Sequence, residues 1–160
     1  MIYEKDSSGA SWAAGSPLFC DWSWVASTGE RPGFRSFAFL VVSKRMSKSL
    51  HNVVETYKTN TTESDIIILG DFNADCSYAS TYELNQLDIR SPEYLWVVPD
   101  SADTTFSENT HCAYDRIVLT SDVDDRFFGR WGVDRNMSSS DVSDHFPVWF
   151  DLDIREDVTE

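Results

Sequence analysis

Apolar and polar positions predict a strand, a helix and a second strand in succession. Residues 34–42, FRSFAFLVV, form an apolar, β-branched and aromatic run that is typical of a strand buried on both faces toward its end. The run 66–69, IIIL, predicts another strand, and a parallel pairing of the two is expected. Between them, behind a cap at Ser47, apolar residues at i, i+3, i+4 and i+7 predict an amphipathic helix: Leu50, Val53, Val54 and Tyr57.

The remaining chain contains further segments of strand length. Strands are expected at 22–26, 94–98 and 113–119, and a short helix at 82–87, whereas the rest of 1–33 is expected to be loops. The segment 146–154, FPVWFDLDI, alternates apolar with polar residues, so one face of this last strand should meet water.

The composition is that of one globular domain with a large negative charge. The chain has 160 residues, 41% hydrophobic and 14% aromatic, and no apolar run approaches the roughly 18 residues of a membrane helix. Its formal net charge is 13 − 27 = −14. A chain of this charge lacks the positive field that holds nucleic acid, so such a substrate would require bound cations, and carboxylates are the ligands that Mg²⁺ and Ca²⁺ prefer.

The three cysteines, Cys20, Cys76 and Cys112, lack the spacing of a zinc site. Their odd number suggests one pair and one leftover, while three reduced, buried cysteines are an alternative of about equal weight. Two Asn-x-Thr/Ser triplets, at Asn60 and Asn136, favour secretion. Residues 1–6 carry no signal-peptide pattern, so either the protein stays inside the cell or its true start lies upstream.

Candidate chemistry begins directly after the IIIL strand, where Asp71 and Asn73 follow Gly70. Active sites in open α/β sheets lie outside the carboxyl ends of strands, so this carboxylate and amide would face a cleft. The alternative is that Asp71 and Asn73 only form an Asx turn that closes the strand, an interpretation of about even weight for the tetrapeptide alone.

Two more carboxylates and an imidazole follow downstream. Asp115 lies on a strand of apolar residues and needs a partner, because a buried unpaired carboxylate is costly. Arg116 is no obvious partner, since neighbouring strand residues point to opposite faces. Asp144 and His145 stand side by side before the last strand, a pair that is a weak signal when taken alone.

Four strings in order, GDFNADCSY, VVPDSADTT, CAYDRIV and SDHFPV, resemble the C-terminal part of the deoxyribonuclease I family. The resemblance covers about residues 66–152, with weaker similarity back to 34. It implies an α/β (α+β) fold, a partial four-layer sandwich of mixed β-sheets flanked by helices. It divides the chain into a poorly matched segment 1–33, the deoxyribonuclease I-like part 34–154 and an acidic tail 155–160.

The resemblance also assigns roles to the candidate residues. Asp71 resembles a residue of the divalent-metal and phosphate site, and Asn73 the amide that holds the phosphate. Asp144 resembles a metal-site carboxylate, His145 one of two catalytic imidazoles and Asp115 the carboxylate that orients a catalytic histidine. Phosphodiester hydrolysis needs an activated water, a proton for the leaving oxygen and cationic stabilisation, which these residue types and Mg²⁺ can supply.

A structural calcium loop and a disulfide are implied as well. Asp103, Thr105 and Thr110 resemble the ligands of a family Ca²⁺ loop, although this chain carries an extra residue between Asp103 and Cys112. Cys76 and Cys112 resemble the family's stabilising disulfide, which leaves Cys20 unpaired.

The chain departs from the family pattern in two respects. Nothing in it corresponds to the family's large N-terminal segment, which supplies a metal-binding glutamate, a second glutamate, DNA-contacting arginines and most of the actin-binding surface. The loop at 42–46 reads VSKRM, where the family has its second catalytic histidine. His51 is expected at a helix surface or core edge, and His111 in a loop.

The sequence therefore predicts a divalent-metal-dependent endonuclease that hydrolyses double-stranded DNA, in a truncated form with weak or no activity. The resemblance implies secretion, and a monomer is expected. Binding to a membrane or to actin is not expected. The alternative is a catalytically dead deoxyribonuclease-like binding protein. A phosphatase or abasic-site endonuclease is disfavoured by the strings CAYDRI and DSADTT.

Overall fold

The computed structural model describes residues 23–27, 38–42, 49–61, 63–136 and 143–153. Two sheets form the frame of this part of the chain. The larger contains five strands in the order β1 (Ser23–Ser27), β2 (Ala38–Val42), β3 (Ile66–Asp71), β5 (Asp115–Thr120) and β4 (Tyr94–Trp96). The smaller pairs β6 (Phe127–Val133) with β7 (Val148–Leu152) in antiparallel fashion.

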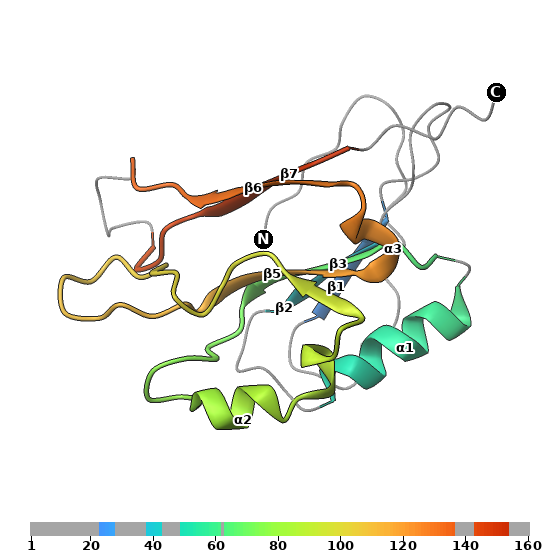
Figure 1. Ribbon diagram of the computed structural model, residues 1–160, viewed down its shortest axis with the longest axis horizontal. Coiled ribbons are helices and arrows are strands. Elements are labelled where there is room, and N and C mark those ends of the chain that lie inside the picture. The colour runs from blue at the N-terminus through green and yellow to red at the C-terminus, as the bar shows by residue number, and fades with distance from the viewer. Residues whose placement is uncertain (1–22, 28–37, 43–48, 62, 137–142, 154–160) are drawn as a thin grey trace.

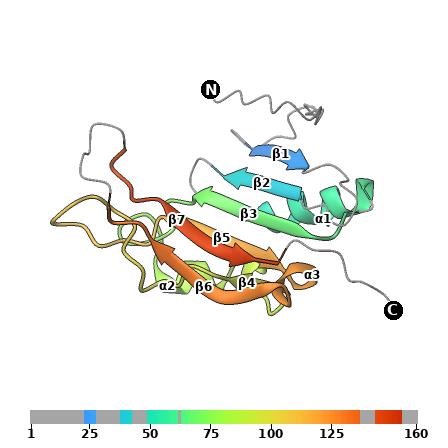
Figure 2. The ribbon, with the colours of Figure 1, turned by 90° about the horizontal axis from the view of Figure 1, so that it is seen from above.

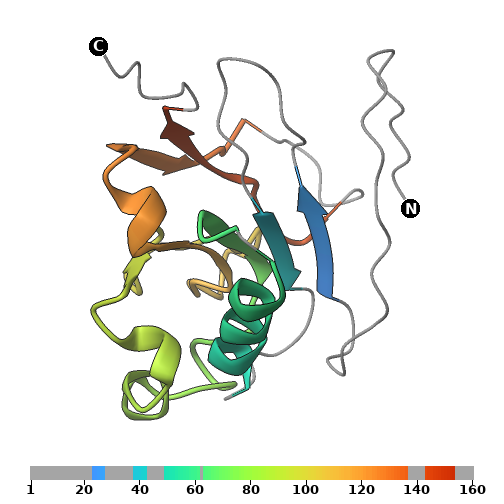
Figure 3. The same ribbon diagram turned by 90° about the vertical axis from the view of Figure 1, so that its right-hand side faces the viewer.

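Short helices complete the architecture. They are α1 (Leu50–Asn60), α2 (Thr81–Asn85), the 3₁₀ helix η1 (Asp88–Arg90) and α3 (Ser121–Asp124). Figures 1 and 3 show α1 and α2 on one side of the five-stranded sheet and the β6–β7 pair on the other. From above, β1 lies at the edge of that sheet beside β2 (Figure 2). The described residues thus form three layers, in which helices, the large sheet and the small sheet follow one another.

Strands β3 and β5 alternate their side chains between two cores. On the helix side, Ile66 and Ile68 are buried with Val54 of α1. On the other side, Ile67 and Leu119 are buried and pack against residues of the small sheet. Because both faces of β3 are covered, its sequence IIIL is a continuous apolar run instead of an alternation of apolar and polar residues.

The predicted strand–helix–strand unit is confirmed. Strand β2 pairs in parallel with β3, and α1 connects them. The helix begins at Leu50 with Ser49 as its N-cap residue. The cap proposed at Ser47, the residues before β2 within 34–37 and Cys20 lie outside the described residues.

Other segments differ from the prediction mainly at their ends. The strands expected at 22–26, 94–98, 113–119 and 146–154 are β1, β4, β5 and β7, and the helix expected at 82–87 is α2. The exposed Trp149 confirms that one face of β7 meets water. Strands β4, β5 and β7 are shorter than the apolar runs that predicted them.

Strand β6 was not predicted from the sequence. Its string FFGRWGV has no clean alternation, and its pairing with β7 shifts register between Phe127 and Trp131. Gly129 has φ +73 in this irregular stretch, a left-handed conformation that favours glycine. Together, the mixed sheets and helices confirm an α+β fold class. Among the described residues, no helix has the length and apolar character needed to cross a membrane.

Candidate active site

An aspartate and a histidine from distant parts of the chain form a hydrogen-bonded pair. Asp115 is the first residue of β5, and His145 precedes β7 by three positions. The Nδ1 atom of His145 lies 2.8 Å from Oδ2 of Asp115. Since an ionised carboxylate only accepts hydrogen bonds, this contact holds the proton on Nδ1 and leaves Nε2 available for proton exchange. His145 is therefore the partner that the half-buried carboxylate of Asp115 requires.

The surroundings of Asp115 work against its ionisation. Burial raises the pKa of Asp115, and the negative charge of Asp71 adds to the rise. The side-chain hydrogen bond of Thr104 and the charge and hydrogen bond of His145 act in the opposite direction and lower it. The carboxylate thus depends on these two neighbours for its charged form.

Asp71, at the end of the neighbouring strand β3, and Asn73, in the turn that follows it, lie at the edge of the same site. Asp71 is the last residue of β3 and is the register partner of Asp115. Asn73 donates from its backbone nitrogen to Oδ1 of Asp71 at 2.9 Å and from Nδ2 to Oδ2 at 2.6 Å. The Asx turn offered as an alternative is therefore present, and the same turn holds the Asn73 amide against the Asp71 carboxylate.

Two further side chains flank His145. The Asp144 side chain is 95% exposed, and its Oδ1 lies 4.0 Å from Nε2 of His145, beyond hydrogen-bond reach. The ring of Tyr114 lies 5.8 Å from the His145 ring, centroid to centroid. Sequence reasoning did not identify Tyr114, because an aromatic residue beside a strand is normally read as core.

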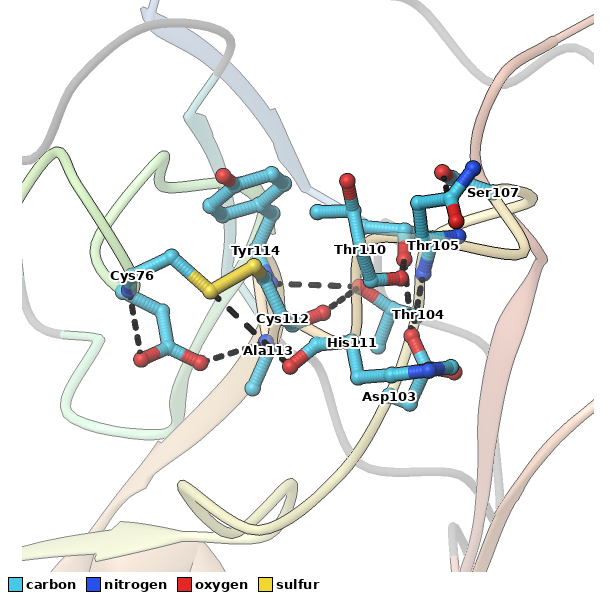
Figure 4. Close-up of a disulfide and its surroundings, with 12 residues drawn as sticks. Cys76, Asp103, Thr104, Thr105, Ser107, Thr110, His111, Cys112, Ala113 and Tyr114 are labelled. Atoms are coloured by element: carbon cyan, nitrogen blue, oxygen red, sulfur yellow. Dashed lines mark hydrogen bonds and ion pairs between the residues drawn. A yellow bond between two sulfur atoms is a disulfide. The ribbon is translucent and has the colours of Figure 1, made fainter.

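The loop from Asp103 to Thr110 closes on itself (Figure 4), and Thr105 within it bridges to His145. The Thr105 hydroxyl lies 2.8 Å from Oδ1 of Asp103 and also contacts the carbonyl oxygen of Thr110. On the opposite oxygen, Oδ2, Asp103 contacts Nδ1 of His111 at 3.1 Å and Nη2 of Arg135 at 3.3 Å. The structure thus brings together the three residues that the sequence singled out, and it adds two cationic or proton-donating partners.

Neighbouring hydrogen-bond donors stabilise the ionised form of Asp103. Burial alone would raise its pKa, but hydrogen bonds from His111, Thr105 and Arg135 outweigh it and lower the pKa of Asp103 to about 2. Around this loop and the His145 site, no group of three or more His, Cys, Asp or Glu side chains that could hold a metal ion occurs within the described residues.

The predicted disulfide between Cys76 and Cys112 is confirmed, and it joins the Asn73 turn to the end of the 103–110 loop (Figure 4). Asp75 reinforces this junction, since its carboxylate accepts hydrogen bonds from the backbone nitrogens of Cys76 and Ala113, both at 2.7 Å. Asp75 was missed by sequence reasoning because its role depends on strand β5 arriving beside it.

The other two histidines have partners elsewhere. His51, on α1, lies 2.9 Å from the hydroxyl of Tyr94, and the exposed His111 pairs with Asp103. Arg116 is fully buried on the face opposite Asp115 and contacts Asp100 at 3.0 Å, as the strand alternation predicted. His145 is therefore the histidine that the described residues place beside Asp115.

The fold and site define an α+β protein with an aspartate–histidine pair at one end of its main sheet. No family model matches the chain. It is 38% identical to deoxyribonuclease-1 of Sus scrofa over 112 residues, which cover 62% of this chain and 39% of that protein. It is 41% identical to deoxyribonuclease-1 of Mus musculus over 96 residues, 52% of this chain and 33% of that protein.

The chain is also similar to a deoxyribonuclease-1-like protein. Deoxyribonuclease-1-like 2 of Homo sapiens is 42% identical over 97 residues, 52% of this chain and 31% of that protein. The resemblance to the deoxyribonuclease I family is thus confirmed over rather more than half of the chain. The chain spans only about a third to two fifths of the length of these curated relatives.

Proposed function

We propose that this chain carries part of the active site of a divalent-metal-dependent deoxyribonuclease that hydrolyses phosphodiester bonds of double-stranded DNA. The observation that carries the proposal is the 2.8 Å contact between His145 and Asp115, next to the Asp71–Asn73 turn. Similarity to proteins named deoxyribonuclease-1 supports it. DNA is the substrate proposed, and the acidic chain would require cations to approach it.

Asp115, His145 and Asn73 would have different roles in the reaction. Asp115 fixes the His145 ring and stabilises its protonated form, so that Nε2 can exchange a proton with an attacking water or a leaving oxygen. Asn73 donates one amide hydrogen to Asp71 and retains a second for a phosphate oxygen. A general acid–base partner typically contributes 10²- to 10⁴-fold, so a site with one imidazole should be slow by about that factor.

Asp71 and Asp144 are the proposed Mg²⁺ ligands. Each oxygen of Asp71 accepts one hydrogen bond from Asn73, and each retains a second lone pair for a cation. Mg²⁺ usually keeps several waters and binds one or two carboxylates together with the phosphate, so an incomplete carboxylate set fits this ion. When bound, Mg²⁺ would neutralise the charge that develops on the phosphate.

Asp103, Thr105 and Thr110 are the proposed Ca²⁺ ligands. The Thr105 hydroxyl has one proton but contacts two acceptors, Asp103 Oδ1 and the Thr110 carbonyl oxygen. One of these oxygen pairs therefore lacks a bridging proton, and a hard cation among the three oxygens would relieve the contact. Arg135 and His111 on the other Asp103 oxygen would oppose that cation.

Secretion and a monomeric state complete the proposal. The Cys76–Cys112 disulfide supports secretion, because disulfides form and persist in oxidising compartments. Actin binding is not proposed.

The alternative is a binding protein that keeps the phosphate pocket without turnover. The sequence VSKRM at 42–46 lacks a second catalytic histidine, and the contacts of His51 with Tyr94 and of His111 with Asp103 favour structural roles for those two. Such a protein would retain cation-dependent affinity for duplex DNA.

Plasmid nicking separates the two functions. With Mg²⁺ and Ca²⁺, slow nicking is expected that EDTA abolishes, that His145→Ala eliminates and that His51→Ala leaves unchanged. Duplex binding measured by fluorescence anisotropy without any nicking would establish the binding protein instead. Nicking that survives His145→Ala would contradict the proposed chemistry.

A further inference from the structure

Thr104 bonds to the backbone of both segments that carry the Asp115–His145 pair. It is fully buried, and it follows Asp103 without belonging to the candidate calcium ligands. Its hydroxyl oxygen accepts hydrogen bonds from the backbone nitrogens of Tyr114 and Asp115, both at 3.1 Å. Its own backbone nitrogen donates to the carbonyl oxygen of Cys112 at 3.0 Å. The Thr104 side chain thus fixes the backbone at the start of β5.

The backbone of the same residue fixes the other half of the pair. The Thr104 carbonyl oxygen accepts a hydrogen bond from the nitrogen of Phe146 at 2.8 Å. One residue further on, Thr105 forms an isolated antiparallel bridge with His145. Because β7 begins only at Val148, the backbone of His145 is held by the pairing of residues 104–106 with 144–146, together with a hydrogen bond from its nitrogen to the Ser143 hydroxyl.

Asp115 and His145 are 30 residues apart in the chain, and Thr104 is one residue that bonds to the backbone of both segments. The hydrogen bond between the side chains is 2.8 Å long, and a displacement of either segment by less than 1 Å would take it beyond about 3.5 Å. Such displacements are large for catalysis, because misplacement by about 1 Å can cost about 10²-fold in rate.

We propose that Thr104 is a positioning residue whose buried hydroxyl sets the alignment of Asp115 with His145. The catalytic consequence rests on the proposed function, whereas the alignment itself does not. Removal of the hydroxyl leaves two backbone donors, at Tyr114 and Asp115, without their acceptor, and the start of β5 must move or admit water to satisfy them.

The test reads the pair directly by nitrogen NMR of the histidine rings. The chain has three histidines, so the ring signals are assigned with His51→Ala and His111→Ala. In the neutral ring, a hydrogen bond to the Asp115 carboxylate should favour the Nδ1–H form of His145 by about tenfold or more. Asp115→Ala, which removes the acceptor altogether, defines the value for a broken pair.

Thr104→Val keeps the shape of the side chain and removes the hydroxyl, and Thr104→Ser keeps the hydroxyl. The matched control is Thr120→Val at the other end of β5, where an equally buried hydroxyl accepts from Ile66 nitrogen and donates to the Ser64 carbonyl oxygen. We expect Thr104→Val to lower the Nδ1–H preference at least threefold toward the Asp115→Ala value. Thr104→Ser and Thr120→Val should retain it.

An unchanged preference in Thr104→Val would overturn the proposal, and so would an equal fall in Thr120→Val, which would indicate general loosening. Should Thr104→Val fail to fold, amide hydrogen exchange of the unaltered protein decides: slow exchange at both Tyr114 and Asp115 supports the role, and exchange at loop rates refutes it. These readouts need no DNA cleavage, so a failed nicking assay would refute the proposed function alone.

Discussion

Replacement of Asp103 by asparagine tests the electrostatics of the 103–110 loop. The variant keeps an acceptor for Thr105 but removes the charge that faces His111 and Arg135. A fall in the pKa of Asp103 from 3.8 to about 2 corresponds to about 2.5 kcal/mol, since each pKa unit is worth about 1.4 kcal/mol. The side chain is 20% exposed, so solvent screening should leave a loss of about 1–2 kcal/mol in the free energy of unfolding at pH 7.

The sign of the pH dependence follows from the lowered pKa. Below its folded pKa the aspartate is protonated in both states, and above 3.8 it is ionised in both. The stabilisation by ionised Asp103 is therefore complete above about pH 4 and is lost as the pH falls toward 2. The difference between the unaltered protein and Asp103→Asn should shrink through this window.

Urea denaturation in EDTA, followed by tryptophan fluorescence from pH 2 to pH 7, measures the effect without bound metal. Glu108→Gln is the matched control, because it removes one exposed carboxylate from the same loop and should change the stability by less than about 0.5 kcal/mol. An Asp103→Asn loss no larger than the Glu108→Gln loss, or a difference that grows on acidification, would refute the reasoning.

Three other predictions concern the same framework. Serine at both Cys76 and Cys112 should cost about 3–4 kcal/mol in urea denaturation, because the disulfide closes a separation of 36 residues; a loss under 1 kcal/mol would contradict the entropy argument. Arg116→Met, which removes the buried partner of an aspartate, should cost about 3 kcal/mol, whereas Arg130→Met at a 68%-exposed ion pair should cost under 1 kcal/mol; equal losses would be inconsistent with burial as the cause. Arg135→Gln should raise Ca²⁺ affinity severalfold in calorimetry, because it removes a cation beside Asp103, and an unchanged affinity would place Ca²⁺ elsewhere.

Local sequence patterns predicted the elements whose environment is uniform. The IIIL run and the helix after it were identifiable, because β3 is buried on both faces and α1 packs one apolar stripe. Strand β6 was not, since Gly129 and a register shift interrupt its pattern. A two-residue period cannot be recognised where the strand itself is irregular.

Some residues of the candidate site were likewise predictable from the sequence, and others were not. Motif resemblance identified Asp115 and His145, but their contact depends on a bridge at Thr105 that no local pattern encodes. Thr104 and Asp75 escaped notice for a related reason: each acts on backbone nitrogens that arrive from a distant segment. A polar residue whose partners are main-chain atoms leaves no complementary residue type in the sequence to be searched for.

The geometry of the Asp115–His145 pair and the catalytic competence of the chain are consequently separate questions. The pair is held by contacts within residues 71–146, through β3, the disulfide and the 104–106 bridge. The proposed turnover would also require a ligand set for the metal and a second proton-transfer group, and the described residues place one imidazole beside Asp115. An aligned pair can therefore exist in a protein that does not nick DNA, which is why ring tautomers and nicking must be measured independently.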